Sequence, residues 1–492
     1  MKKAVVIGAG PAGLTAGIRL SEGGWDVTVL EQQAGPGGNL RSWTRRGHTI
    51  DNCLHWLNGT RDGTRLNRLW RSLGVLGDGV RLVRQPFFYR SYLSGETLTM
   101  WRDPDRAESE LSEKSPRDAR AVRRFFRDAK ALAYGSPFAR AAVVARWFPV
   151  SVGDFADSLS DPDLATFFSD YLGREYASLG LLFAYSAFLS GDADLPVGGS
   201  PGVAERLAGK LVSSGGKLIC SVRVSGIVVN DRRATAVLTD RGDAFPADRV
   251  IAACDPHLTF SRLLPPELAP TALARIDRDP RTPHFSSLHA AFSIPDPLPP
   301  GAAWTTVIPG NADALPKRTG GRVILRAFAH ESGFAPEGRT VLQATCFVSD
   351  GDAGAWLERG ADYTERKDAF VSSVAEAIRG AFPYAAPEPV DAWTPATYER
   401  YTGADRGDYI GWLLPAGVIP PRLPERVKGL ENVSLSSGWC RMPGGLPTAA
   451  RSGARAAADA MFRDPLPRLY PGVSLPERGK KAKKRRKFDL PS

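Results

Sequence analysis

Three glycines and one acid near the start of the chain have the types and spacing of a site that holds a dinucleotide. A short apolar run, Ala4 to Ile7, leads into Gly8-Ala9-Gly10-Pro11-Ala12-Gly13. Gly8 permits a tight turn from strand to helix, Gly10 lets the backbone approach a pyrophosphate, and Gly13 lets the helix pack closely on the strand. The phosphates then lie at the helix N-terminus. A second apolar run, Trp25 to Leu30, is predicted to be a strand, and Glu31 at its end is placed to bind a ribose hydroxyl. A turn with a purely structural role is the alternative.

A second glycine cluster follows Glu31, at Gly35-Pro36-Gly37-Gly38-Asn39-Leu40-Arg41-Ser42. It can carry the chain back along the cofactor and bring the basic group of Arg41 beside it. An exposed loop without a ligand is the alternative, because glycine and proline also mark ordinary turns. The same βαβ unit serves NAD and FAD, so the first motif alone leaves the dinucleotide undecided.

A third glycine loop lies near the other end of the chain. A predicted strand, Val433 to Leu435, precedes Ser436-Ser437-Gly438-Trp439, and Pro443-Gly444-Gly445-Leu446-Pro447 precedes a helical pattern over Ala449 to Ala460. A loop that opens a helix offers backbone N–H groups and the positive end of the helix to an anionic partner. An ordinary strand, loop and helix without a ligand is the alternative.

Cys53 and His55 are the side chains that could move protons near such a cofactor. A thiol and an imidazole two positions apart can form a proton relay. In an extended segment, however, residues i and i+2 share a face, so packing explains the same spacing. We keep both as catalytic candidates, and we interpret Tyr401, Tyr409 and Trp412 as cavity or core residues rather than proton donors.

The elements that must position these loops alternate along the chain. We expect a helix from about Gly198 to Ser213, strands at 217–220, 222–229, 234–239 and 249–253, and a hairpin over 87–101. Residues 285–348 alternate like an antiparallel sheet, and an amphipathic helix with Phe370 to Phe382 on one face follows it. Two apolar helical segments, Phe138 to Val150 and Leu179 to Leu189, are either buried core or the walls and mouth of a tunnel for an apolar substrate.

The bulk composition is that of a globular protein with two to four domains. Its 492 residues are 43% hydrophobic and 24% charged, and no apolar run reaches the roughly 18 residues of a membrane-spanning helix. Five scattered cysteines and six histidines show no metal-ligand spacing, so we expect no metal. Only four apolar residues follow Met1-Lys2-Lys3, which is too few for a signal peptide, and we expect the protein in the cytoplasm.

Positive charge is concentrated at the end of the chain. Of the formal net charge of +11, the segment from Leu475 to Ser492 carries +6 and the rest carries +5. The modest charge of the body does not favour a nucleic-acid partner. The basic tail is interpreted either as a peripheral contact with an anionic membrane or as a disordered solubilising tail.

Taken together, the three loops resemble the flavin-dependent amine oxidase and phytoene desaturase superfamily. Within it, the chain is most similar to the branch of bacterial phytoene desaturases, carotene cis-trans isomerases and retinol saturases. Asp51-Asn52-Cys53-Leu54-His55-Trp56 resembles part of the family's opening, and Pro196 to Ser200 with Val224-Ser225-Gly226-Ile227 resembles its middle segment. Three positions depart from the family pattern, namely Asn39, Trp439 and Pro443.

The resemblance implies FAD as the cofactor and a backbone group near Val224 that meets adenine. The implied fold is α/β, a discontinuous Rossmann-like FAD-binding domain with an inserted α+β substrate domain that contains an antiparallel sheet and helices. The FAD-binding domain then comprises residues 1–75, 196–260 and 425–463, the substrate domain 76–195 and 261–424, and a basic, disordered tail 464–492. The candidate cofactor contacts are Gly8, Gly10, Pro11, Ala12, Gly13, Glu31, Gly37, Gly38, Asn39, Arg41, Val224, Gly438, Gly444, Gly445, Leu446 and Pro447.

The implied activity is a desaturase, saturase or isomerase that acts on an apolar polyene or lipid by hydride transfer at the flavin. A flavin-dependent amine oxidase and a non-catalytic, membrane-associated flavoprotein are the alternatives. No second G-x-G-x-x-G occurs, so a separate nicotinamide domain is not expected. The expected location is the cytoplasm, and an apolar substrate makes peripheral contact at the inner face of the membrane a further possibility.

Overall fold

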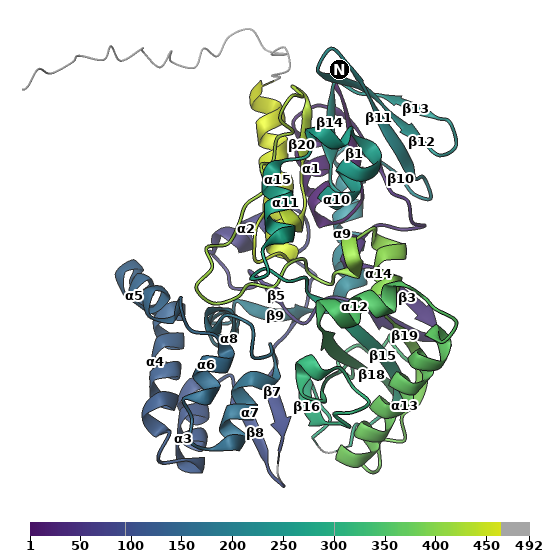
Figure 1. Cartoon of the computed structure of the whole chain (residues 1–492). Helices are drawn as coiled ribbons and strands as arrows, with labels where there is room; N and C mark the ends of the chain where they lie inside the picture. The colour runs from purple at the N-terminus through teal and green to yellow at the C-terminus, as the bar shows by residue number, and fades with distance from the viewer. Residues whose placement is uncertain (94, 300, 464–492) are drawn as a thin grey trace, which may run out of the picture.

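A five-stranded parallel sheet organises the upper part of the molecule in Figure 1. This computed structural model describes residues 1–93, 95–299 and 301–463. The order across the sheet is β10 (Lys217–Ile219), β2 (Asp26–Leu30), β1 (Lys3–Ile7), β14 (Arg249–Ala252) and β20 (Val433–Leu435). All neighbouring pairs run parallel. The strands come from both ends and the middle of the chain, which confirms the predicted discontinuous Rossmann-like fold.

Three helices pack together beside this sheet. Helix α1 (Pro11–Glu22) lies against α9 (Gly199–Ser213) and α15 (Leu446–Arg463). The buried face of α15 consists of small residues, and a Cβ on Gly453 would lie 2.2 Å from the carbonyl oxygen of Ala12. The close approach of the two helices therefore depends on glycine at this position. The two ends of the chain are held together in this way.

Several small sheets and helices surround this core. Strands β11 (Val224–Asn230), β12 (Arg233–Thr239) and β13 (Ala244–Pro246) form an antiparallel sheet, close to the predicted strands. Strand β3 (Ser42–Arg45) pairs with β4 (His48–Asp51), and β9 (Ala193–Pro196) lies between β5 (Leu57–Asn58) and β6 (Leu82–Val83). The short helices are α2 (Arg65–Ser72), α10 (Pro256–Leu258) and α11 (Thr271–Arg278).

A seven-stranded mixed sheet forms the second large unit. Its order is β19 (Glu388–Trp393), β15 (Ser286–Pro295), β18 (Arg339–Val348), β17 (Arg322–Ala327), β16 (Thr305–Pro309), β7 (Phe87–Tyr92) and β8 (Thr97–Trp101). The predicted hairpin β7–β8 joins this sheet through a parallel pairing of β7 with β16, a connection that local sequence patterns do not predict. Helix α13 (Tyr363–Ala381) buries Phe370, Val374, Ala375 and Ile378 in the apolar cluster that it shares with this sheet. Helices α12 (Asp350–Leu357) and α14 (Pro395–Thr402) lie nearby in Figure 1.

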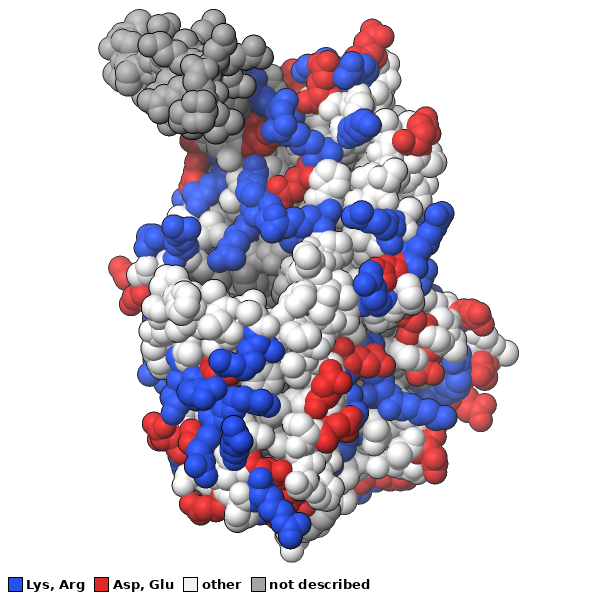
Figure 2. Space-filling model, turned by 60° about the vertical axis from the view of Figure 1, so that its left-hand side comes forward, with Lys and Arg blue, Asp and Glu red and all other residues white. Residues whose placement is uncertain are grey.

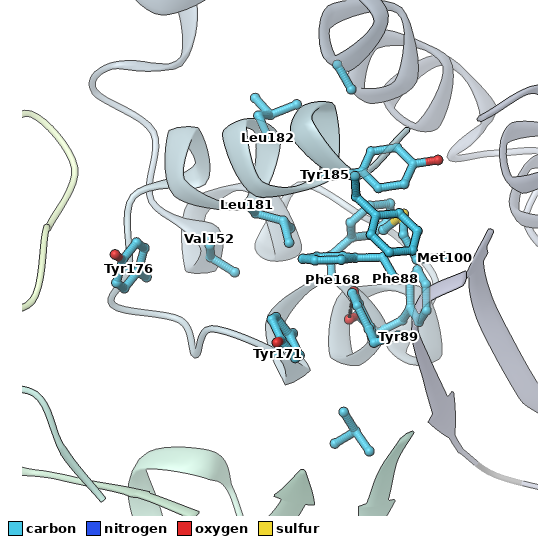
Figure 3. Packing of buried hydrophobic residues seen from close by; sticks show 14 of the residues in the cluster. Phe88, Tyr89, Met100, Val152, Phe168, Tyr171, Tyr176, Leu181, Leu182 and Tyr185 are labelled. Atoms are coloured by element: carbon cyan, nitrogen blue, oxygen red, sulfur yellow. Dashed lines mark hydrogen bonds between the residues drawn. The ribbon is translucent and has the colours of Figure 1, made fainter. Parts of the chain in front are cut away.

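Six helices form a separate layer beside β7 and β8 in Figure 1. They are α3 (Pro104–Lys114), α4 (Ala119–Tyr134), α5 (Pro137–Trp147), α6 (Val152–Asp157), α7 (Pro162–Asp170) and α8 (Ser178–Leu189). Their common core is rich in aromatic side chains that meet edge to face or at a tilt, among them Phe88, Phe168 and Tyr185 (Figure 3). The apolar segment of α8 is therefore mostly buried core, one of the two predicted alternatives.

The apolar segment from Phe138 to Val150 differs from the buried-core alternative, whereas the walls and mouth of a tunnel stay a prediction. On α5 only Val143 and Trp147 are buried, and the side chain of Phe138 is 85% exposed. The prediction of a buried helix was wrong because apolar composition does not reveal on which side neighbouring elements pack. None of the helices in the described part of the chain is long and apolar enough to cross a membrane.

Candidate functional site

The turn between β1 and α1 has the geometry that its glycines predict. Gly8 adopts a positive φ of 101°, and a Cβ on Gly13 would lie 2.0 Å from the carbonyl oxygen of Gly8. A Cβ on Gly10 would meet only the Cα of Gly38, at 3.8 Å. Gly13 is thus required by packing within the protein, whereas the space beside Gly10 is open to a ligand.

The N-terminus of α1 faces that open space. Gly10 is the N-cap residue and brings no side chain to cap the helix, and Pro11 opens the first turn. The first turn also carries no acidic residue. Backbone N–H groups and the positive helix end are therefore free to bind an anion such as a pyrophosphate.

Glu31 is fixed beside this turn by its own backbone contacts. Its two carboxylate oxygens accept hydrogen bonds from the backbone N–H of Ala9 at 2.8 Å and of Gln33 at 2.9 Å. Burial raises the pKa of Glu31, because desolvation disfavours the ionised form. Each oxygen keeps a further lone pair, so the carboxylate can accept hydrogen bonds from ribose hydroxyls.

Two cavities meet at the glycines and together form one long trough. The first, about 220 Å³, is lined by Gly8, Glu31 and Val224, and the second, about 160 Å³, by Pro11, Gly438 and Trp439. Gly10 and Gly38 line both cavities, as do Ala253, Cys254 and Thr402. An elongated dinucleotide matches this shape, with adenine near Val224, phosphates at α1 and the second ring system near Gly438. The residues present therefore fit FAD.

The other predicted cofactor residues shape the trough or line it. Gly37 donates its N–H to the carbonyl of Ala9 at 2.9 Å, and the side chain of Arg41 donates to the carbonyl of Gly35 at 3.3 Å. Asn39, which departs from the family pattern, donates from its amide nitrogen to the carbonyl of Tyr409 at 2.7 Å. Asn39 thus ties the second glycine cluster to the segment that precedes the closing loop.

The closing loop passes close to that same segment. A Cβ on Gly444 would lie 2.3 Å from the carbonyl oxygen of Ile410, and Gly445 adopts a positive φ of 90°. Leu446 then begins α15 and lines the second cavity, and Pro447 occupies the next position of the helix. Gly444 and Pro447 therefore form the backbone around the cavity, while Gly438, Gly445 and Leu446 line it.

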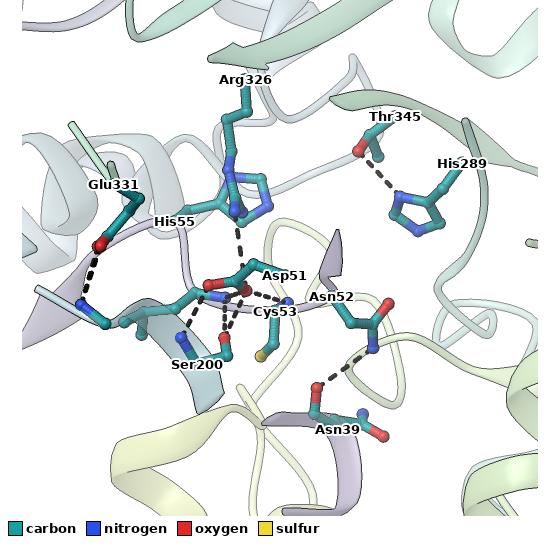
Figure 4. Close-up of polar contacts among 12 residues, drawn as sticks. Asn39, Asp51, Asn52, Cys53, His55, Ser200, His289, Arg326, Glu331 and Thr345 are labelled. Carbon is teal, nitrogen blue, oxygen red and sulfur yellow. Dashed lines mark hydrogen bonds and ion pairs between the residues drawn. The ribbon is translucent and has the colours of Figure 1, made fainter. Parts of the chain in front are cut away.

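Cys53 and His55 lie on a bent segment rather than in one extended strand (Figure 4). Cys53 lines the second cavity, whereas His55 lies in a different, small cavity with Arg326. Burial raises the pKa of Cys53 to about 12 and lowers the pKa of His55 well below its ordinary value. Both groups are therefore uncharged at neutral pH, and the geometry does not favour a relay between them.

His55 instead belongs to a wall of aromatic side chains. Its two ring nitrogens lie 3.2 Å from the hydroxyl of Tyr171 and 3.2 Å from the hydroxyl of Tyr409. Trp56 continues this wall toward the helical layer through Phe88, with ring centroids 5.1 Å apart. Tyr409 and Trp412 are buried, as predicted for cavity or core residues, while Tyr401 is 38% exposed at the rim.

Two buried polar residues near this wall were not predicted as site residues, although Asp51 belongs to the segment that resembles the family's opening. Asp51 accepts hydrogen bonds from the backbone and hydroxyl of Ser200 and from the backbone N–H of Cys53, and so fixes the bend (Figure 4). Arg326, on β17, lies 3.9 Å from Asp51, and its guanidinium lies beside the His55 ring in Figure 4. Only the pairing of distant segments places Arg326 there, so no local motif could have identified it.

Comparison with known proteins agrees with this arrangement. Residues 11–461 match the family described as flavin containing amine oxidoreductase. Prolycopene isomerase 2 from an Oncidium hybrid is 25% identical over 517 residues, which cover 95% of this chain and 85% of the relative. A neurosporene-forming phytoene desaturase from Rhodobacter capsulatus is 29% identical over 291 residues, 54% of each chain.

Solved structures share the fold at low sequence identity. An oxidoreductase from Methanosarcina mazei superposes with a TM-score of 0.66 at 16% identity and covers 93% of this chain and 100% of its own. Putrescine oxidase bound to putrescine gives a TM-score of 0.58 at 20% identity, over 94% and 99% of the two chains. With the family match across most of its length and a trough that fits the cofactor, the chain belongs to the flavin containing amine oxidoreductase family and is an FAD-dependent oxidoreductase.

Proposed function

We propose that this enzyme desaturates, saturates or isomerises an apolar polyene. The observation that carries the proposal is the similarity to prolycopene isomerases, which extends over 95% of the chain. The matches to phytoene desaturases over about half of the chain point to the same class of substrate. Bound FAD would supply hydride transfer, so the protein has to supply position and electrostatics.

The residues of the trough account for the positioning of the cofactor. The N-terminus of α1 binds the phosphates, and Glu31 binds the ribose through hydrogen bonds. Asn39 links the glycine cluster to Tyr409, so the cofactor trough and the aromatic wall are held in one arrangement. A substrate that lies against Tyr409 is thereby held at the ring end of the trough.

The wall itself is suited to an apolar substrate. The side chains around His55 are aromatic, and burial keeps the pKa of His55 below and the pKa of Tyr409 well above their ordinary values. Neither group carries a charge at neutral pH. An apolar chain can therefore lie against these two side chains without removing a charged group from water, and the guanidinium of Arg326 beside them is already buried within the protein.

One feature of the wall argues against the amine oxidase alternative. The guanidinium of Arg326 lies at the same place, is buried, and lowers the pKa of His55 by its positive charge. The ammonium group of an amine would be repelled by this cation. The amine oxidase structures that share the fold are only about 20% identical and therefore bear on the fold alone.

Incubation with defined substrates tests the proposal. The FAD-loaded enzyme is mixed with vesicles that contain phytoene or prolycopene, and separately with putrescine, and products are separated by chromatography. We expect a change in the number or geometry of double bonds only in the polyenes, and no change with a flavin-free Gly10→Val variant. Flavin bleaching by amines without polyene conversion would overturn the proposal, and conversion of neither class would favour the non-catalytic flavoprotein.

We also propose that the enzyme works in the cytoplasm at the surface of an anionic membrane, where an apolar substrate resides. The predicted basic tail lies outside the described residues. Within them, α5 supports the proposal, because it exposes Phe138 and because α4 and α5 also expose arginines, at positions 120, 123, 124, 127, 140 and 146. Figure 2, which brings this side forward, shows Lys and Arg side chains gathered beside a surface without charge. Exposed aromatic groups flanked by cations are typical of helices that lie on anionic membranes.

A further inference from the structure

Two Asp–His pairs lie beside Trp439, at the end of the cofactor trough that is lined by Gly438 and Trp439. The acids, Asp255 and Asp408, both line the 160 Å³ cavity. The imidazoles belong to His257 and His284, and their ring centroids are 6.4 Å apart. Trp439 packs against both imidazoles, with centroid distances of 5.4 and 6.3 Å.

The imidazole of the first pair is protonated at neutral pH. His257 Nδ1 lies 2.7 Å from Asp255 Oδ1, and its Nε2 lies 3.1 Å from Asp277 Oδ1. Although burial opposes the charge, hydrogen bonds to the two carboxylates raise the pKa of His257 to about 10. The side chain of Asp277 is 24% exposed, so this pair reaches solvent.

In the second pair, one imidazole nitrogen has no hydrogen-bond partner among the described residues. His284 Nδ1 is hydrogen-bonded to Asp408 Oδ2, and Asp408 Oδ1 accepts a hydrogen bond from the hydroxyl of Ser286 at 3.1 Å. His284 Nε2 is buried and has no hydrogen-bond partner among the described residues, and the residue is only 3% exposed. A buried nitrogen without a partner is costly and calls for an explanation.

The charges around His284 favour a proton on this ring. The charged groups that face it, from every element packed around it, are Asp408, Asp277, His257, Arg406 and Asp350. Burial opposes ionisation, but the hydrogen bond to Asp408 leaves the pKa of His284 above its ordinary value. Burial also raises the pKa of Asp408 to about 6.

The arrangement does not have the features of a metal site. In the ranges that the structure describes, no three His, Cys, Asp or Glu side chains come together in a way that could hold a metal ion. Because Nδ1 faces Asp408, the lone pair of a neutral His284 ring lies on Nε2, where a proton can bind.

We propose that His284, held by Asp408, is a proton acceptor whose occupancy is linked to the redox state of the bound cofactor. When an external donor places two electrons in the cofactor cavity, the added negative charge favours a positive charge nearby. His284 Nε2 then accepts one proton from solvent, on the side of His257 and Asp277, and Asp408 remains the partner of the imidazolium. The proton returns to solvent when the electrons leave, so no further reactant is required.

The inference rests on FAD binding and not on the identity of the substrate. It is tested by photoreduction of the FAD-loaded enzyme with EDTA as electron donor, without any substrate. A pH-indicating dye reports the number of protons bound per FAD reduced, from about pH 6 to about pH 9. The wild-type protein is expected to bind up to one proton more than His284→Gln across part of this range.

Matched variants separate this role from a structural one. His48→Gln changes another buried histidine, bonded to Ser293 at 2.8 Å and outside the trough, and should keep the wild-type proton count. Asp408→Asn should shift the extra proton to lower pH, because it removes the carboxylate that raises the pKa of His284. This second variant decides the matter if His284→Gln fails to fold or to bind FAD. Proton counts equal to wild type at every pH in whichever of these variants binds FAD would overturn the proposal.

Discussion

The glycine turn at Gly8 to Gly13 and the aromatic wall around His55 meet at one trough, yet they are specified in different ways. In the turn, the residue types follow a short, fixed spacing, with Gly13 packed against the carbonyl of Gly8 five positions earlier, and the missing side chain of Gly10 leaves space for the phosphates. In the wall, His55 meets Tyr171 and Tyr409, which are 116 and 354 positions away in the sequence. A cofactor site of the first kind can be identified from spacing, whereas a substrate site of the second kind exists only after the fold brings its parts together.

This contrast predicts that the two regions respond differently to substitution. A single added side chain at Gly10, the open position of the turn, should abolish cofactor binding while leaving the fold intact. The wall is supported by a large apolar core, so substitutions there should act through packing and in proportion to the volume removed.

The largest effect is expected for Gly10→Val. The new side chain enters the space of the pyrophosphate but has no protein atom closer than 3.8 Å to its Cβ, so the fold should persist and FAD should be lost. Flavin absorbance and circular dichroism of the purified protein measure the two outcomes. Gly209→Ala on α9, where a Cβ meets nothing within 4 Å, is the matched control and should keep full flavin content.

The sequence carried enough information to predict the cofactor region. The turn, Glu31, the strands of the parallel sheet and the C-terminal loop all follow from local spacing and alternation. Local spacing and alternation did not predict the exposure of the segment Phe138 to Val150 or the position of Arg326. Both failures have the same physical reason. The burial of α5 depends on which side its neighbours pack, and the position of Arg326 depends on the pairing of β17 within a sheet whose strands are far apart in the sequence. The exact boundaries of the two predicted domains and the contacts of each cofactor residue stay predictions.

The second effect concerns the core that supports the wall. Phe168 is fully buried among Phe125, Phe155 and Phe167. Phe168→Ala should lower the free energy of unfolding by about 3–5 kcal/mol, because it removes apolar contacts and leaves a cavity. Phe138→Ala, at a side chain that is 85% exposed, should change it by less than about 0.5 kcal/mol. Urea unfolding followed by tryptophan fluorescence compares the two, and equal losses would contradict the burial pattern.

A smaller effect is expected from pH at the boundary between the two regions. His257 has a folded pKa of about 10 against an ordinary value of 6.5, so its stabilisation is fully present below about pH 6.5 and is lost as the pH rises through 10. One pKa unit corresponds to about 1.4 kcal/mol, so the full shift is equivalent to roughly 5 kcal/mol; because Asp277 is partly exposed and solvent screens its charge, we expect a loss of about 2–3 kcal/mol over this range. Urea midpoints measured across the range should fall in the wild-type protein and stay flatter in His257→Gln. Parallel curves for the two proteins would show that the ion pairs with Asp255 and Asp277 do not stabilise the fold.

The smallest effect on stability should be accompanied by a clear effect on membrane binding. Complete burial of a phenylalanine side chain contributes about 1.5–3 kcal/mol, so insertion of Phe138 into an anionic bilayer should make Phe138→Ala bind about tenfold more weakly at equal stability. Co-sedimentation with anionic vesicles at low salt measures this. The arginines of α4 and α5 should make the binding weaken with salt, because the screening length falls from about 10 Å at 0.1 M to about 3 Å at 1 M.

A chain that ends at Pro476 separates the two candidate anchors. If it loses binding while Phe138→Ala keeps it, the basic tail is the anchor, and the exposure of α5 has another origin.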